Sequence, residues 1–392
     1  MVNQNSLGCF VVHIAFIASL SFSTSQSLGN GITNNALFIF GDSTVDSGNN
    51  NYIDTIPENK ADYKPYGQNG VFREPTGRFS DGRVITDFIA EYANLPLLPP
   101  FLKPSIDYSN GVNFASGGAG VLPETNQGLV IDLPTQLRNF EEVRKSLEEK
   151  LGEEKSIELI SEAVYFISIG SNDYMGGYLG NPKMQEKYNP EQYIGIVIGN
   201  LTQAIQNLYY KGARKFGFLS LSPLGCQPAL RAANPDEANK GGCFEAASSL
   251  ALAHNNALSK VVTRFNQVFK GFMYSNSNFY DWLQDKINNP TNYGIFKDGI
   301  NACCGNGPYG GIYTCGGTKK IKEYNLCDNV EEFVWWDSFH PTEKIHEQFA
   351  KVLWNGSNSI VGPYNLERLF NNDIKFMTIA DVVDVSKIEH EY

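Results

Sequence analysis

Residues 36–43 read Ala-Leu-Phe-Ile-Phe-Gly-Asp-Ser, an unbroken apolar run that ends at a glycine and is followed two positions later by a serine. Apolar residues without alternation are typical of a strand buried on both faces of a parallel sheet. Gly41 allows a sharp turn at the strand end, which would expose the hydroxyl of Ser43. A lone serine after a strand is also a common helix N-cap, so the rest of the chain must decide its role.

Three other short apolar runs, at residues 163–169, 215–221 and 271–274, also have the character of buried strands. Between them, apolar residues recur at helical spacing over residues 137–151 and 194–208. This alternation predicts an α/β fold with a parallel sheet.

Ligands of such sheets bind beyond the carboxyl ends of the strands. Gly-Asp-Ser at 41–43 follows the first run, and Gly-Ser-Asn-Asp at 170–173 follows the run that ends at residue 169. These two segments are therefore the first candidates for a functional site.

The composition limits the possible classes of protein. The chain has 392 residues, of which 42% are hydrophobic and 19% charged, enough to bury a core without a partner. No linker or repeat divides it, so we expect one domain over residues 28–370, a C-terminal tail over 371–392, and a monomer. The net charge of -11 argues against nucleic-acid binding.

The N-terminus has the features of a secretory signal peptide. An apolar run over residues 7–20 is too short to span a membrane and leads to small polar residues ending at Ser27. We therefore expect a signal peptide over residues 1–27, a secreted protein and no stable membrane span. Two sequons, at Asn200 and Asn355, are candidate glycosylation sites in such a protein.

The cysteines indicate disulfides rather than a metal site. Cys9 lies in the signal peptide, which leaves an even six, without the CxxC pairs or nearby histidines that zinc would require. We favour a Cys226–Cys243 bridge because both residues flank one loop. The Gly-, Asn- and Cys-rich stretch over residues 292–328 is expected to be an irregular excursion held by disulfides.

Asp337-Ser-Phe-His340-Pro places a carboxylate and an imidazole three residues apart, before a segment that Pro341 would direct into a helix. One turn could bring Asp337 to His340, leaving the other imidazole nitrogen to accept a serine proton. An isolated aspartate and histidine at this spacing also occur in surface turns. The other histidines are weaker candidates and lie in a helical stretch, in the helix after Pro341 and in the tail: His254, His346 and His390.

An acyl-transferring serine also needs hydrogen-bond donors for the oxyanion. The glycine-rich stretch 113–120 could supply backbone N–H groups, and Asn172 could supply a side-chain amide. Both could equally be ordinary turns. No GxSxG surrounds any serine, which argues against the nucleophile elbow of α/β-hydrolases.

Taken together, these segments resemble the plant GDSL esterase/lipase family of the SGNH hydrolase superfamily. Four stretches match the family's blocks in order, with Thr44 in place of the usual leucine: 38–51, 111–120, 170–173 and 337–341. Residues 75–83 and 223–226 are also similar to the family, so the resemblance extends from about residue 36 to residue 365.

The resemblance implies Ser43 as nucleophile, His340 as general base and Asp337 as its orienting partner. It implies an oxyanion hole from the Ser43 N–H, the Asn172 amide and a glycine of the second block, for which we choose Gly117 and keep Gly118 as the alternative. The implied fold is a flavodoxin-like three-layer α/β/α sandwich around a five-stranded parallel sheet. No metal or organic cofactor is implied.

The predicted activity is hydrolysis of carboxylic acyl esters, on a small-molecule or lipid substrate. Acyl transfer to an alcohol is the alternative, because the same acyl-enzyme would serve both reactions. A catalytically silent lipid- or carbohydrate-binding protein is disfavoured, because Ser43, Asn172, Asp337 and His340 are all present.

Overall fold

The computed structural model describes residues 35–69, 71–72, 74–236 and 240–371. The predicted signal peptide lies outside the described residues, as does the predicted tail apart from residue 371.

A six-stranded sheet forms the centre of the described chain, with strand order β10-β5-β4-β3-β1-β2. The strands are β1 (Leu37–Gly41), β2 (Gly111–Asn113), β3 (Val164–Ser168), β4 (Lys215–Phe218), β5 (Met273–Ser277) and β10 (Val361–Pro363). The first five are parallel in the order 2-1-3-4-5, and β10 adds an antiparallel edge beside β5. The predicted flavodoxin-like fold is thus confirmed, with one additional edge strand.

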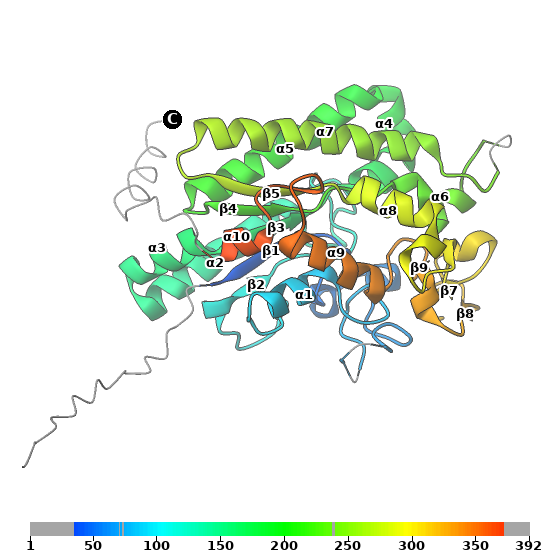
Figure 1. Cartoon of the computed structure of the whole chain (residues 1–392), viewed down its shortest axis with the longest axis horizontal. Coiled ribbons are helices and arrows are strands. Elements are labelled where there is room, and N and C mark those ends of the chain that lie inside the picture. The colour runs from blue at the N-terminus through cyan, green and yellow to red at the C-terminus, as the bar shows by residue number, and fades with distance from the viewer. Residues whose placement is uncertain (1–34, 70, 73, 237–239, 372–392) are drawn as a thin grey trace, which may run out of the picture. The chain divides into compact units, whose positions relative to one another are not determined.

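Two layers of helices cover the sheet, as Figure 1 shows with α5 and α7 on one side and α1 and α9 on the other. One layer contains α2 (Leu133–Leu151), α3 (Glu153–Glu162), α5 (Pro190–Tyr210) and α7 (Glu245–Val268). The other contains α1 (Ile85–Tyr92), α8 (Phe279–Asn288), α9 (Glu343–Asn355) and α10 (Leu366–Phe370). Two short helices, α4 (Pro182–Lys187) and α6 (Pro228–Ala232), lie in the connections.

Strand β1 shows why the deciding run has no polar positions. Phe38 and Phe40 pack into the core under α2 and α5, whereas Leu37 and Ile39 pack into the core under α1 and α9. Alternate residues of a strand point to opposite faces, so a strand between two helical layers is apolar throughout.

The two longest predicted helical faces belong to α2 and α5, and both helices have clear start signals. Asp132 caps α2 by accepting a hydrogen bond from the Thr135 N–H, and Asn189 forms a capping box with Gln192 at the start of α5. A proline follows each cap within the first turn, where its missing N–H has no helical partner to lose.

The predicted excursion contains two small two-stranded sheets. In one, β6 (Asp298–Ala302) pairs with β9 (Phe333–Trp335); in the other, β7 (Cys304–Gly305) pairs with β8 (Asn325–Leu326). Disulfides Cys303–Cys327 and Cys304–Cys315 fasten it, and the predicted Cys226–Cys243 bridge is confirmed.

Short non-α turns complete the described elements. The 3-10 turns are η1 (Asn49–Tyr52), η2 (Pro57–Asn59), η3 (Tyr108–Asn110), η5 (Leu224–Cys226), η7 (Pro290–Tyr293), η8 (Pro308–Gly310) and η9 (Val330–Glu332), and η4 (Asp173–Leu179) is a π-helix. Among the described helices, none combines the length and the apolar character that a membrane crossing requires.

Candidate active site

The structure brings Ser43, His340 and Asp337 into one line of hydrogen bonds. The Ser43 Oγ lies 2.8 Å from His340 Nε2, and His340 Nδ1 lies 2.8 Å from Asp337 Oδ1. Ser43 follows β1, whereas the other two residues lie between β9 and α9, almost three hundred positions later in the chain. These contacts are the hydrogen bonds by which an imidazole could take a proton from the serine hydroxyl.

The turn that presents Ser43 depends on Gly41. A Cβ built on Gly41 would lie 2.3 Å from the carbonyl oxygen of Ser168 on β3, so no larger residue fits. The Asp42 N–H donates to the same carbonyl at 3.1 Å, while the Val45 and Asp46 N–H groups donate back to the Asp42 carbonyl. The chain thus turns sharply after β1 and directs the serine towards the cavity.

Asp337 is fully buried and receives hydrogen bonds on both carboxylate oxygens. Oδ1 accepts from the backbone N–H groups of Phe339 and His340, both at 2.9 Å, as well as from the imidazole. Oδ2 accepts from the Tyr66 hydroxyl at 2.7 Å. Burial by itself would raise the pKa of Asp337, but His340, Lys319 and Tyr66 outweigh it and lower this pKa to about 2.

The side-chain amide of Asn172 is held in place by a hydrogen bond. Its side chain lines the cavity beside Ser43, and its Nδ2 donates one hydrogen bond to the Ala119 carbonyl at 2.9 Å. An amide nitrogen carries two donors, so this bond orients the group and leaves a second N–H for a ligand.

The N–H of Gly117, which was chosen from the sequence as an oxyanion donor, is engaged by a buried carboxylate. Its N–H donates to Asp46 Oδ2 at 2.9 Å, and a Cβ on it would lie 2.6 Å from the Phe79 ring. Gly118, which has a φ of 85°, lines the cavity instead. The geometry therefore favours Gly118, because the Gly117 N–H already has an acceptor.

Buried carboxylates fix the glycine-rich stretch against the segments around it. Asp173 accepts hydrogen bonds from the Val121 N–H, the Leu122 N–H and the Thr125 hydroxyl at 2.8, 3.0 and 2.7 Å. Asp46 accepts a hydrogen bond from the Gly117 N–H, which lies earlier in the same stretch. Burial raises the pKa of both carboxyl groups to about 6, against the opposing effect of these donors.

The cavity beside Ser43 has a volume of about 240 Å³. Ser43, His340, Asn172 and Gly118 line its polar part. The apolar part is formed by Met175, Leu219, Leu221, Phe279 and Phe339. A polar reacting centre beside an apolar surface suits an ester that carries an apolar group.

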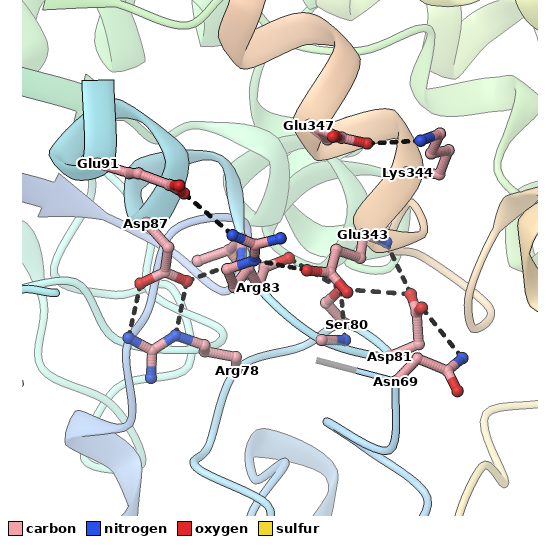
Figure 2. A network of polar contacts seen from close by, with 12 residues as sticks. Asn69, Arg78, Ser80, Asp81, Arg83, Asp87, Glu91, Glu343, Lys344 and Glu347 are labelled. Carbon is pink, nitrogen blue, oxygen red and sulfur yellow. Dashed lines mark hydrogen bonds and ion pairs between the residues drawn. The ribbon is translucent and has the colours of Figure 1, made fainter. Parts of the chain in front are cut away.

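Residues 75–83 make polar contacts with helix α1 and with the start of α9, which follows His340 in the chain. Arg78 forms a buried ion pair with Asp87 at 2.7 Å, and Arg83 pairs with Glu343 at the start of α9 at 2.7 Å (Figure 2). Asp81 accepts from the Glu343 backbone N–H at 2.7 Å (Figure 2). This block joins α1 to α9 and so fixes the segment that carries Asp337 and His340.

Two other histidines that the sequence offered are buried and lie away from the cavity. His254 Nδ1 is hydrogen-bonded to the Tyr174 hydroxyl at 2.9 Å, and His346 lies in α9. Burial lowers the pKa of each to about 3, so both are neutral near pH 7. His390 lies outside the described residues.

Three residues of this site were not predicted from the sequence: Tyr66, Phe79 and Lys319. Tyr66 and Lys319 lie behind Asp337, and the Phe79 ring lies against the His340 ring. Phe79 lies within residues 75–83, and the resemblance of this stretch to the family was the one feature of the sequence that could have indicated its role. Tyr66 and Lys319 stand in loops whose local sequence gives no sign of contact with Asp337.

Comparison with known proteins gives consistent matches along most of the chain. A family model described as GDSL-like Lipase/Acylhydrolase matches residues 37–353. GDSL esterase/lipase 5 of Arabidopsis thaliana is 45% identical over 379 residues, covering 94% of this chain and 97% of that protein. A GDSL lipase of Tanacetum cinerariifolium is 45% identical over 335 residues, covering 86% and 87%.

A second Arabidopsis thaliana protein, GDSL esterase/lipase 1, is 43% identical over 374 residues, covering 94% of this chain and 99% of that protein. The matched span of the family model contains all four segments that carried the resemblance. The chain therefore belongs to the GDSL-like lipase and acylhydrolase family and is a carboxylic ester hydrolase.

Proposed function

We propose that the protein hydrolyses acyl esters through a covalent acyl-enzyme on Ser43. The observation that carries this proposal is the pair of 2.8 Å hydrogen bonds linking Ser43, His340 and Asp337 at the wall of a cavity. A serine hydroxyl is a weak nucleophile unless a neighbouring base removes its proton, and His340 is placed to do so.

In the first half of the reaction, Ser43 Oγ attacks the ester carbonyl carbon while His340 Nε2 takes the hydroxyl proton. The carbon–alkoxy bond then breaks as His340 returns that proton to the leaving alcohol, which leaves an ester on Ser43. In the second half, His340 deprotonates a water molecule that attacks this ester and releases the acid. Asp337 holds the imidazole tautomer and stabilises its protonated form throughout.

The oxyanion of each tetrahedral intermediate would be bound by three donors: the Ser43 N–H, the Gly118 N–H and the second Asn172 amide hydrogen. Gly118 replaces Gly117 in this proposal because Asp46 already accepts the Gly117 N–H. A preorganised donor of this kind can lower the barrier by about 3 to 4 kcal/mol.

The decisive experiment is the Ser43→Ala variant assayed on a series of acyl esters of different chain length. Removing the nucleophile should lower kcat by about 10⁴-fold or more while the variant stays folded. Ser222→Ala is the matched control, since Ser222 also lines the cavity and should remain active. A folded Ser43→Ala enzyme with full activity would end the proposal, as would phosphonate labelling of a different serine.

We also propose that the protein is secreted and glycosylated. Three disulfides within the described chain suit an oxidising compartment, and the side chains of Asn200 and Asn355 are both exposed. Intact-mass measurement of protein from its native tissue, before and after glycosidase treatment, checks this. An unchanged mass would count against glycosylation, and six free thiols would count against secretion.

A further inference from the structure

Lys319 is a cation buried almost completely behind the catalytic aspartate. Only 1% of its surface is exposed, although it belongs to the irregular segment between Cys315 and Cys327. Its Nζ lies 4.0 Å from the centre of the Tyr313 ring, 5.0 Å from Tyr66 and 5.1 Å from Tyr63. Three aromatic faces around one ammonium group form a cage that favours the charged state.

The ammonium group of Lys319 makes two hydrogen bonds inside this cage. One goes to the Cys315 carbonyl at 3.0 Å, and the other goes to the Tyr66 hydroxyl oxygen at 3.2 Å. The Tyr66 hydroxyl oxygen is the acceptor in this bond, so the hydroxyl proton of Tyr66 can be donated to another group. It points to Asp337 Oδ2, at 2.7 Å.

The line of contacts therefore runs from Lys319 through Tyr66, Asp337 and His340 to Ser43. Within the described chain, Tyr66 is the side chain seen to donate to Oδ2, whereas Oδ1 has three N–H donors. Burial and the neighbouring Asp337 charge raise the pKa of Tyr66 well above its usual value, so its hydroxyl keeps the proton it donates.

We propose that Lys319 is a positioning residue for ester hydrolysis, acting through Tyr66 to keep the Asp337 carboxylate ionised and turned towards His340. This inference rests on the proposed roles of Ser43, His340 and Asp337. It also gives the disulfide-bonded excursion a function, because that segment carries the cation to the catalytic residues.

A purely structural role explains the burial less well. Placing an ammonium group in the interior is unfavourable unless an opposite charge or strong acceptors compensate it. A methionine of similar length would fill the same space without that penalty. Burial lowers the pKa of Lys319 to about 8. The negative charges of Asp337 and Glu58 oppose this effect and so provide the compensation.

The sign of the expected pH effect follows from the charges around the pair. Lys319 faces Asp337, Glu58 and the three tyrosines, and Asp42 and His346 are the titratable groups whose charge interacts with His340. Removing one positive charge lets the Asp337–His340 pair bind a proton more readily. The free base needed for catalysis is then lost at a higher pH.

The test compares Lys319→Met, Tyr66→Phe and the double variant with Lys320→Met, an exposed neighbour on the same segment. Each single variant should lower kcat by about 5- to 10-fold, with KM changed less than about 2-fold, because neither residue lines the cavity. The acid limb of the kcat/KM profile should move up by about half a pH unit. The double variant should be no worse than the poorer single variant, since the two residues act in series.

Intact disulfides and unchanged thermal unfolding in each variant would exclude a folding defect. An acid limb that stays in place in both Lys319→Met and Tyr66→Phe would overturn the inference, even if kcat falls. Wild-type kinetics in both variants would overturn it as well, and would leave the proposed function intact if Ser43→Ala remains inactive. An effect of Lys320→Met equal to that of Lys319→Met would also contradict it.

Discussion

The ring of Phe79 lies against the imidazole of His340, with ring centres 4.9 Å apart and planes inclined by 37°. The Phe79 ring also lies so close to Gly117 that a Cβ built on this glycine would be 2.6 Å from it. Phe79 thus contacts both the glycine-rich stretch and the His340 ring, and it limits the orientations open to the imidazole. The ion pairs around Arg78 and Arg83 fix its backbone (Figure 2).

Replacing Phe79 by leucine should therefore lower kcat by about 10-fold while leaving the protein folded. Leucine preserves most of the apolar contact but not the flat surface beside the imidazole, and small misplacements of a catalytic group are costly. Phe265→Leu is the matched control, because Phe265 is a buried phenylalanine on α7 that packs against Phe269 and Phe272. Steady-state kinetics with thermal unfolding checks this. Equal kcat values in the two variants would contradict the role given to Phe79.

Asn172→Ala should lower kcat by about 10² to 10³-fold with a much smaller effect on KM, because the amide would bind charge that develops in the transition state. Ser222 serves for comparison, since it also lines the cavity and has no part in the proposed oxyanion hole. Ser222→Ala should retain most of its kcat. If instead Asn172→Ala raises KM and keeps kcat, Asn172 binds the substrate rather than the oxyanion.

Local sequence revealed the main strands and three catalytic candidates for physical reasons that can be stated. Strands β1, β3, β4 and β5 were recognisable because helices cover both sides of the sheet. Strand β2 was missed because it has only three residues, of which the first is a glycine and the last an asparagine. Ser43 and the Asp337–His340 pair could be singled out because a strand end and a single turn place them, and the family resemblance implied their roles.

The remaining features of the site depend on tertiary contacts. Whether Gly117 or Gly118 faces the cavity is decided by Asp46, whose carboxylate takes the Gly117 N–H from a separate loop. Tyr66 reaches Asp337 across 271 positions, and nothing in the residues around Tyr66 indicates that contact. Side-chain contacts of this kind arise only once the fold has brought the loops together.

Stability should rise as the pH falls from about 6 and should be highest near pH 4. Burial raises the pKa of four aspartates to about 6 from 3.8, namely Asp42, Asp46, Asp81 and Asp173. Between these values the folded state binds protons more readily than the unfolded state, so acidification stabilises the fold. His254 and His346 act oppositely, because their pKa falls from 6.5 to about 3 on folding.

Four aspartates outnumber two histidines in this window, so the net effect is a gain as the pH falls from about 6 to about 4. Below that range the histidines and Asp337, whose pKa is lowered to about 2, destabilise the fold. Thermal unfolding from pH 3 to 8 tests this, and Asp81→Asn should reduce the gain. A Tm that declines steadily from pH 7 to pH 5 would show that the buried aspartates do not dominate.

Hydrolysis should exceed acyl transfer when simple alcohols are supplied. The acyl-enzyme on Ser43 is the same electrophile in both reactions, and the product depends on which nucleophile His340 deprotonates in place. A well-oriented bound alcohol can reach an effective molarity of about 10⁵ M or more, so a modest acceptor site would suffice for transfer.

The measurement is the ratio of free acid to new ester as an alcohol is titrated against a fixed acyl donor. We expect free acid to predominate at every concentration of a short-chain alcohol, and wild-type and Ser222→Ala enzymes to give the same ratio. A native alcohol that yields more ester than acid at sub-millimolar concentration would make the protein an acyltransferase that uses the same Ser43 chemistry.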